Sequence, residues 1–514
     1  MKAFTRRFAG VALAAALVIP LAACGTSSPQ GTQTGGEVDT SARFRYGGAA
    51  IPASLDPRTS SPYDGAWTGL LYESLIKRAP DGTFHPGLAT EWKAAPDLLS
   101  LDFTLRPNLK FTDGAPVNAA AVKANIEWAQ KHTTNFSNFI ANVSAVEVID
   151  DTHVRLRFTD SGAPMLGVFA GEAGMLISPA ALDRTDLSKV SFGAGPFKLD
   201  KFEGANMSFS KSDSYWNKDS VKLAGVDVTV YIDEAARLRA LRSGQLDYTN
   251  IQPKQVAESK AAGLQIVTGD IADFWGVILN TGRSEFGNPK VRQAMLLAVD
   301  RKSIADNIFP DSCVPSAQPF SPGDWALPPD LDKSPAAQFN VARAKQLMAE
   351  AGLPNGFTFE LQTGTAQTNM QLSQVLQSQW KEIGINVVVK PMENVQFVTA
   401  RRQGNFDATV SVYQSGRPDE SVVVQNFYLP GGLFNPGKYT LPGVAELLKQ
   451  SSSTLDPAGR AQPMHKIMTD ALADGPPLIP ICTRTGLWAT GPKVRGVKAS
   501  LQFDPILQDV WLAK

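Results

Sequence analysis

The sequence has few histidines and cysteines and no surplus of either charge. Its 514 residues include four histidines and three cysteines, and Lys+Arg and Asp+Glu both total 49. No H-E-x-x-H, G-x-S-x-G or P-loop motif occurs, and no two histidines share helical i, i+4 spacing. The sequence therefore predicts a protein that is not an enzyme, holds no metal or cofactor, and does not bind nucleic acid.

Long apolar runs are also scarce, and the one that exists is N-terminal. Lys2, Arg6 and Arg7 precede an apolar stretch at 11–21, which ends in Leu-Ala-Ala-Cys24-Gly. This order is typical of an export signal with a lipobox, so residues 1–23 are a predicted lipoprotein signal peptide and Cys24 a predicted lipidation site. A plain signal peptide with an incidental cysteine is the alternative. Several acyl chains on Cys24 would anchor the protein to the outer face of the cell membrane, on its periplasmic or extracellular side.

Residues 24–43 are rich in Gly, Ser, Thr and Gln, which predicts a flexible tether before a folded body that begins near residue 44. Two cysteines remain in that body, Cys313 and Cys482. In an oxidising compartment they form either one long-range disulfide or two buried free thiols. Neither has the C-x-x-C spacing of a redox or zinc site.

The rest of the chain alternates between strand and helix patterns, which predicts an α/β fold of two or three domains. Asp233 and Asn340 are predicted helix caps. A helix is expected from Asn288-Pro289 to about Phe309. Strands are expected at 43–48, 207–212, 226–232, 357–361, 386–390 and 407–413, with a hairpin over 146–158.

Residues 101–123 carry the densest pattern. Leu101, Phe103 and Leu105 alternate with polar residues, as in a half-buried strand, and 109–111 is expected to form a second short strand. Asp113-Gly114 is a turn signal. Asn118 then caps a predicted helix over 119–129.

These blocks resemble a segment of the bacterial oligopeptide-, dipeptide- and nickel-binding lipoproteins, solute-binding protein family 5 of ABC transporters. More landmarks similar to that family follow in its order over about residues 44–500: Leu55-Asp56-Pro57, Gly193–Phe197, Tyr215-Trp216, Ser243–Asp247, Val291–Ala294 and Ala344–Met348. One departure is Ala121, where the family pattern has an aspartate.

The resemblance implies a periplasmic-binding-protein-like α/β fold, with two α/β lobes, hinge strands and the extra small domain typical of peptide-binding members. Carried over, lobe 1 combines 44–70, 192–285 and 488–514, the small domain is 71–191, and lobe 2 is 286–487. Crossings near 285 and 487 would act as hinges around an enclosed ligand.

The implied function is capture of a small peptide or peptide-like solute by a monomer, which delivers it to ABC permease subunits. The scarcity of histidine weighs against the nickel-binding branch. The alternative is a non-transport regulatory lipoprotein on the same scaffold, which binds a protein or an envelope intermediate.

The resemblance places the ligand-reading loop at 410–430. In the peptide-binding branch an aspartate of this loop pairs with the ligand's α-amine, but Arg417 stands at that position here. An arginine favours a carboxylate, a phosphate or an amide-rich ligand. Alternatively, Arg417 pairs with Asp419 or Glu420, or a shift of the alignment by a residue or two returns Asp419 to the amine-binding role.

Other candidates lie on loops and strands near the expected ligand. Tyr63 and Asp64 follow the first strand, and Tyr413 ends the strand expected at 407–413. Trp275 and Asn280 lie beside the expected crossing, and the alternative for Trp275 is a core aromatic. Phe434 and Asn435 complete the set, with a tight turn around a buried phenylalanine as the alternative.

Overall fold

The computed structural model describes residues 36–60, 64–79, 82–415, 418–498 and 507–514. Within them, no helix has both the length and the apolar character needed to cross a membrane. The predicted signal peptide and Cys24 lie outside the described residues. The predicted tether ends earlier than residue 43, because Asp39 N donates to Leu512 O (2.9 Å) and Lys514 N to Glu37 O (3.0 Å). Backbone pairing with the C-terminal residues thus holds the chain before the first strand.

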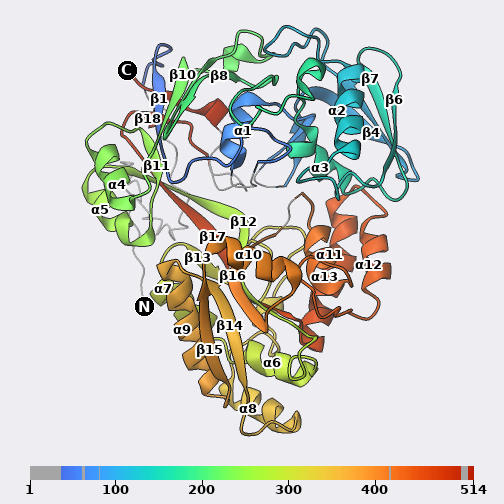
Figure 1. Cartoon of the computed structure of the whole chain (residues 1–514), viewed down its shortest axis with the longest axis vertical. Helices are drawn as coiled ribbons and strands as arrows, with labels where there is room; N and C mark the ends of the chain where they lie inside the picture. Colours follow the sequence, from blue (N-terminus) through green and yellow to red (C-terminus); the bar gives the residue numbers. More distant parts are fainter. Residues whose placement is uncertain (1–35, 61–63, 80–81, 416–417, 499–506) are drawn as a thin grey trace, which may run out of the picture. The chain divides into compact units, whose positions relative to one another are not determined.

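Most described strands belong to one mixed sheet, in the order β15-β14-β16-β12-β17-β11-β1-β10-β9-β8, and β13 pairs with β17 (Figure 1). β1 pairs in parallel with β10 and β11, whereas β12 is antiparallel to both β16 and β17. The bounds are β1 Arg43–Gly48, β8 Phe197–Glu203, β9 Asn206–Lys211, β10 Gly225–Val230, β11 Tyr248–Asn250, β12 Gln265–Leu279, β13 Cys313–Pro315, β14 Thr358–Gly364, β15 Asn386–Met392, β16 Ala408–Gln414 and β17 Leu478–Thr490.

Three main hydrophobic cores divide this architecture into the two lobes and the small domain. The core of lobe 1 includes Phe44, Phe209 and Trp488, together with helix α1 (Gly65–Leu71). The core of the small domain includes Phe103 and Ile126. The core of lobe 2 includes residues from Phe274 to Cys482. The fold is therefore the two-lobed α/β architecture with an extra small domain that the sequence predicts.

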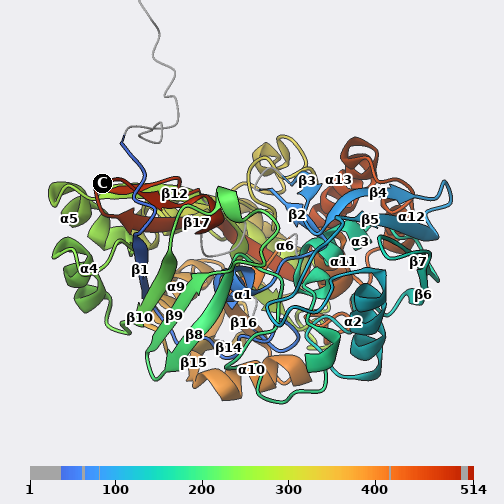
Figure 2. The ribbon, with the colours of Figure 1, turned by 90° about the horizontal axis from the view of Figure 1, so that it is seen from above.

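The crossing between the lobes lies on β12 and β17. Ile271 packs in the lobe 1 core and Phe274 in the lobe 2 core, so β12 changes core earlier than the predicted crossing near 285. On β17, Cys482 belongs to lobe 2 and Trp488 to lobe 1, which brackets the expected crossing near 487. One long antiparallel pair thus connects the lobes, as Figure 1 shows; Figure 2 shows the same pair from above.

The small domain is built on the sheet β4-β5-β7-β6 and helix α2. Leu101, Phe103 and Leu105 of β5 are buried, and Asn118 caps α2 by accepting from Ala121 N at 3.0 Å. The strand expected at 109–111 is wrong, since only an isolated bridge from Lys110 to Pro116 forms there. The bounds are β2 Ile76–Arg78, β3 Phe84–Pro86, β4 Ala89–Ala94, β5 Ser100–Leu105, α2 Ala119–Lys131, β6 Val143–Val148, β7 His153–Phe158 and α3 Met165–Ala170.

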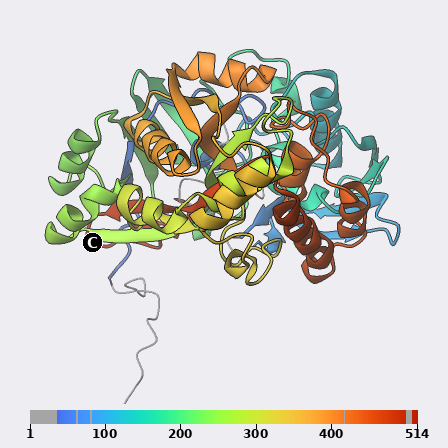
Figure 3. The same ribbon diagram turned by 90° about the horizontal axis from the view of Figure 1, so that it is seen from below.

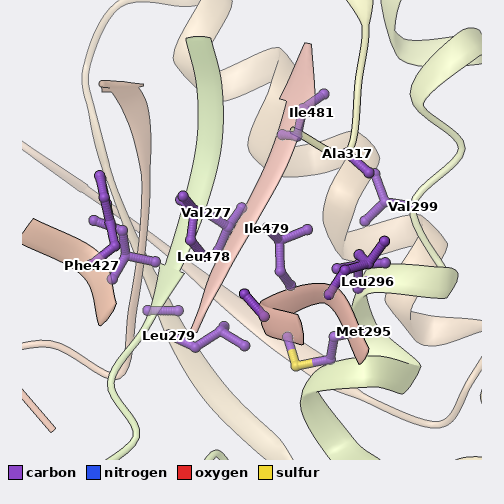
Figure 4. Packing of buried hydrophobic residues seen from close by; sticks show 14 of the residues in the cluster. Val277, Leu279, Met295, Leu296, Val299, Ala317, Phe427, Leu478, Ile479 and Ile481 are labelled. Carbon is purple, nitrogen blue, oxygen red and sulfur yellow. The ribbon is translucent and has the colours of Figure 1, made fainter. Parts of the chain in front are cut away.

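In lobe 2, helices pack against the parts of β12 and β17 that lie in the lobe 2 core. Apolar side chains of β12 and β17 pack with Met295 and Leu296 of α6 (Figure 4). They are Val277, Leu279, Leu478, Ile479 and Ile481. The single helix expected over 288–309 is wrong: the Asp300 carboxylate accepts from Ser303 N at 2.9 Å and starts a second helix, α7. The bounds are α6 Pro289–Leu297, α7 Arg301–Ile308, α8 Val341–Glu350, α9 Gln367–Lys381, α10 Asn394–Gln403, α11 Ser421–Tyr428, α12 Val444–Ser451 and α13 Pro457–Asp474.

Lobe 1 completes its surface with the α4–α5 segment beside β11 and the strands β18 and β19 near the C-terminus. Asp233 caps α4 by accepting from Ala236 N at 2.6 Å. Leu238 and Leu241 of α4 share a small core with Leu487 and Ala489 of β17. The bounds are α4 Glu234–Arg242, α5 Val256–Ala261, β18 Val494–Arg495 and β19 Trp511–Leu512.

A disulfide joins Cys313 of β13 to Cys482 of β17, with a Cα–Cα distance of 5.5 Å and a sequence separation of 169 residues. The two cysteines therefore form the predicted long-range disulfide and are not two free thiols. Because the loop it closes is long, the bond removes much of the conformational freedom of the unfolded chain.

We therefore expect loss of this disulfide to lower the free energy of unfolding by about 3–5 kcal/mol. Urea unfolding of the oxidised protein, the reduced protein and the C313A/C482A variant measures this difference. Two thiols titrated in the unfolded, non-reduced protein would contradict the pairing.

Candidate ligand-binding site

The register of β12 against β17 shifts at the crossing between the lobes. Asp270 faces Thr485 and Phe274 faces Thr483, so residues 271–273 bulge opposite Arg484 alone. Neighbouring segments attach to this bulge. Ser415 N donates to Ala272 O at 2.9 Å, and Ser321 Oγ donates to Ile271 O at 3.1 Å. The start of the 415–421 segment and the loop after β13 therefore converge on the crossing.

Asp273 is the charged residue at the centre of the bulge. It is fully buried, and Arg484 Nη1 lies 3.1 Å from its Oδ2. Its Oδ1 has no hydrogen-bond partner among the described residues. Burying an acceptor without a hydrogen bond is unfavourable by about 1–3 kcal/mol of free energy. A hydrogen bond from a bound ligand would recover this free energy.

Gln414 lies directly opposite Asp273 on β16. Residues opposite each other in an antiparallel pair present their side chains on the same face of the sheet. The Nε2 of Gln414 is buried and, within the described residues, also lacks an acceptor. The crossing thus presents one unused acceptor and one unused donor side by side.

The segment after β16 is fixed by Asp419. Its two oxygens accept from Arg460 Nη1 and Nη2, each at 2.8 Å, and Oδ1 also accepts from Ser421 Oγ at 2.6 Å. Burial acts to raise the pKa of Asp419, but the charge and hydrogen bonds of Arg460 outweigh it and hold the pKa below its usual range. A ligand amine at this carboxylate would have to compete with Arg460.

Glu420, the next residue, pairs with Arg78 of β2, and both side chains are largely buried. Burial, opposed by Arg78 and reinforced by Asp324 and Asp419, raises the pKa of Glu420 to about 8. Burial is also the main cause that raises the pKa of Asp324 to about 6. The predicted ligand-reading loop, 410–430, therefore contributes two residues to a charge cluster that also includes Arg78 of the small domain.

The predicted aromatic candidates pack inside lobe 2. Tyr413 is buried, its hydroxyl lies 2.8 Å from Thr409 Oγ1, and its ring meets those of Phe427 and Phe434. Trp275 packs against Phe309 with ring centroids 5.1 Å apart. These side chains pack in and against the lobe 2 core. Their contact with a ligand remains a prediction.

The two predicted asparagines bind backbone groups of their own lobe. Asn280 Nδ2 donates to Phe406 O at 2.9 Å. Asn435 Nδ2 donates to Leu429 O at 2.8 Å, and its Oδ1 accepts from Tyr439 N at 2.8 Å. Both amides thus position loops of lobe 2. Asp64 is buried directly before α1, whereas Tyr63, Arg417 and Cys24 lie outside the described residues.

Sequence reasoning missed Asp273, Gln414, Arg78 and Arg460. Asp273 carried a usable signal, because it is a lone charge within Ile-Ala-Asp-Phe-Trp-Gly-Val-Ile-Leu. A charge in a buried strand requires a partner or a ligand. Arg460 carried no such signal, since it is one of several arginines on helices and its partner lies 41 residues away.

The fold and the crossing define the class of the protein: a two-lobed solute-binding protein of the periplasmic-binding-protein type. The binding protein AgaA of A. tumefaciens R10, solved with agropinic acid, superposes with a TM-score of 0.78 at 26% identity and covers 92% of this chain and 99% of its own. A dipeptide-binding protein of Pseudoalteromonas sp. SM9913, solved with Met-Leu, superposes with a TM-score of 0.77 at 21% identity, covering 92% of this chain and 100% of its own.

The sequence comparison is more specific. The family "Bacterial extracellular solute-binding proteins, family 5 Middle" matches residues 83–435, and the chain belongs to this family. The glutathione-binding protein GsiB of Escherichia coli O1:K1 is 26% identical over 451 residues, which cover 82% of this chain and 86% of GsiB. GsiB of Salmonella typhi has the same identity and coverage.

The Glu420 cluster predicts a pH-dependent stability. Glu420 titrates at a pKa of about 8 in the folded protein, against 4.5 for an unperturbed glutamate. Between these values the folded protein holds a proton that the unfolded chain has lost, so the free energy of unfolding falls as pH rises, by at most about 1.4 kcal/mol per pH unit. Urea unfolding from pH 5 to 8 measures the slope, and E420Q should flatten it. An unchanged slope in E420Q would assign the effect to other groups.

Proposed function

We propose that the chain captures a peptide or peptide-like solute outside the cytoplasmic membrane and delivers it to the permease of an ABC importer. Membership of the solute-binding family supports the capture. The relatives are named for different solutes, glutathione for GsiB and agropinic acid or Met-Leu for two solved structures. The solute of this chain must therefore be argued from its own residues.

The observation that carries the proposal is the unused acceptor and donor at the crossing. Asp273 Oδ1 can accept from an N–H group and Gln414 Nε2 can donate to a carbonyl oxygen, and neither has a partner among the described residues. An amide group offers both partners together. The backbone of a peptide, or an amide of a related solute, would satisfy both atoms where the lobes meet.

The long strands supply the mechanism. Among the described residues, one antiparallel pair, with an irregular register at its centre, carries the chain between the cores of lobe 1 and lobe 2. Bending at the bulge would let the lobes close on a solute and open to release it. A permease that contacts the closed form differently from the open form would couple capture to transport.

The remaining sequence predictions extend this proposal. Arg417 would bind an anionic or amide-rich part of the solute, and Tyr63 and Asp64 would face it from lobe 1. Cys24 would carry the lipid that holds a monomer at the outer face of the membrane. The regulatory alternative gains no support from the described contacts, because none of them fills the positions of Asp273 Oδ1 and Gln414 Nε2.

Solute binding should depend on both unused groups. Native mass spectrometry of the purified protein identifies any co-purified solute, and isothermal titration then measures its affinity. We expect Q414M to raise Kd about tenfold, the loss of one hydrogen bond, and D273N to raise it more because a charged acceptor is lost.

The matched control is D113N, in the exposed turn after residue 112, which should bind as the wild type does. Unchanged affinity in Q414M and D273N would remove the amide site. No co-purified solute together with no thermal shift by di- and tripeptides would count against solute capture itself.

Anchoring is tested separately at Cys24. In cells of the source bacterium, C24S should move the protein from the membrane fraction to the soluble extracytoplasmic fraction, because no acyl chain would be attached. Mass spectrometry of the wild-type N-terminal peptide should find a diacylglyceryl-modified cysteine. An unmodified N-terminal peptide would leave a plain signal peptide as the correct interpretation.

A further inference from the structure

The small domain contacts lobe 2 directly, through residues outside strands β12 and β17. Helix α3 faces α11–α13 in Figures 1 and 3. A Cβ atom added at Gly167 of α3 would lie 2.0 Å from Pro418 O, so glycine permits this close approach. Ser161 Oγ donates to Ser452 O, and Leu455 packs against the small-domain core. These contacts can exist only while the small domain and lobe 2 lie together.

An ion pair crosses the same contact. Arg78 of β2 binds Glu420, 342 residues away, and its Nη1 lies 3.5 Å from Pro418 O. The side chains are 14% and 2% exposed, so the pair is shielded from water. Taking either charge into such a site without its partner would be strongly unfavourable.

The pair is part of a larger cluster with more acids than bases. Asp419 is held by Arg460 of α13 with both side chains buried, and Asp324 of the loop after β13 interacts electrostatically with Arg78 and Asp419. The cluster therefore combines three carboxyl groups with two guanidinium groups. One carboxyl group remains without a compensating charge while the contact is buried.

Among the described residues, no third basic side chain forms an ion pair with this cluster. On β2, Lys77 pairs with Glu73. His465 of α13 lies 2.9 Å from Trp325 O through Nε2. Helices α3 and α11 contain no charged side chain. The surplus carboxyl group is thus best accommodated by a bound proton.

We propose that Arg78, Glu420, Asp324, Asp419 and Arg460 form a proton-dependent latch, which holds the small domain against lobe 2 and takes up about one proton when the contact forms. This inference rests on the proposed capture of solute by lobe closure. The raised pKa of Glu420 agrees with it.

The physical reason is the difference between the buried and the solvated cluster. When the small domain is separated from lobe 2, Arg78 is fully charged in water, and the pKa of Glu420 returns toward that of an ordinary glutamate. Bringing the two together removes water from three carboxyl groups at once. Closure is then favoured at lower pH, and a solute bound by closure would be held more tightly there.

The test measures the contact itself and needs no solute. Spin labels on D160C, in the small domain, and E446C, on α12, report the distance across the contact by electron–electron resonance; both positions are exposed. We expect a short-distance population at pH 6 that gives way to a longer one at pH 8.5. The ratio of the two should change by up to about tenfold per pH unit.

Variants separate the latch from other causes. E420Q should keep the short distance at both pH values, R78M should lose it, and R78K should restore it in part. Melting temperatures and circular dichroism verify that each variant folds. R155M, which breaks the Arg155–Asp102 pair inside the small domain, is the matched control and should behave as the wild type.

The proposal is overturned if E420Q follows the wild-type pH profile, or if R78M keeps the short distance throughout. Its failure is distinguishable from failure of solute capture. A latch that responds as expected in a protein that binds no solute would stand while the proposed function falls. If the protein binds solute but the spin-label distances do not change with pH, the proposed function stands and the latch proposal falls.

Discussion

The antiparallel pairing of β12 with β17 is the constraint on which the rest of the structure depends. These two strands contribute to both lobe cores. Strand β16 pairs with β12, and β13 and β11 pair with β17. The disulfide fastens β13 to the same pair. Since a strand's register decides which side chains face which core, the register shift at 271–273 places one carboxylate at the junction of the lobes.

Charge burial is the second constraint, and it acts on two aspartates near the end of β16. Asp273, opposite Gln414, has one partner, and its Oδ1 has none among the described residues. Asp419 is saturated by Arg460 and Ser421. A low-dielectric interior tolerates such groups only when their hydrogen bonds are completed, so the incomplete group is the one expected to receive a solute.

Local signals in the sequence predicted local structure well. The caps Asn118, Asp233 and Asn340 each accept from a backbone N–H of the helix that they were expected to start. Periodicity alone missed the break at Asp300, because a helical pattern on both sides conceals a cap in the middle. The site depends on partners distant in sequence, such as Arg78 and Glu420, which no periodicity brings together.

The fold and the ligand chemistry are therefore set by different parts of the chain. The fold is shared with relatives at 26% identity, since buried apolar periodicity survives extensive substitution. Under the proposed function, recognition would rest on a few polar atoms at the crossing. In this chain an arginine already satisfies Asp419, so under the proposed function a solute amine would find its better acceptor at Asp273, on the strand pair that joins the lobes. Binding and closure would then act on the same bulge.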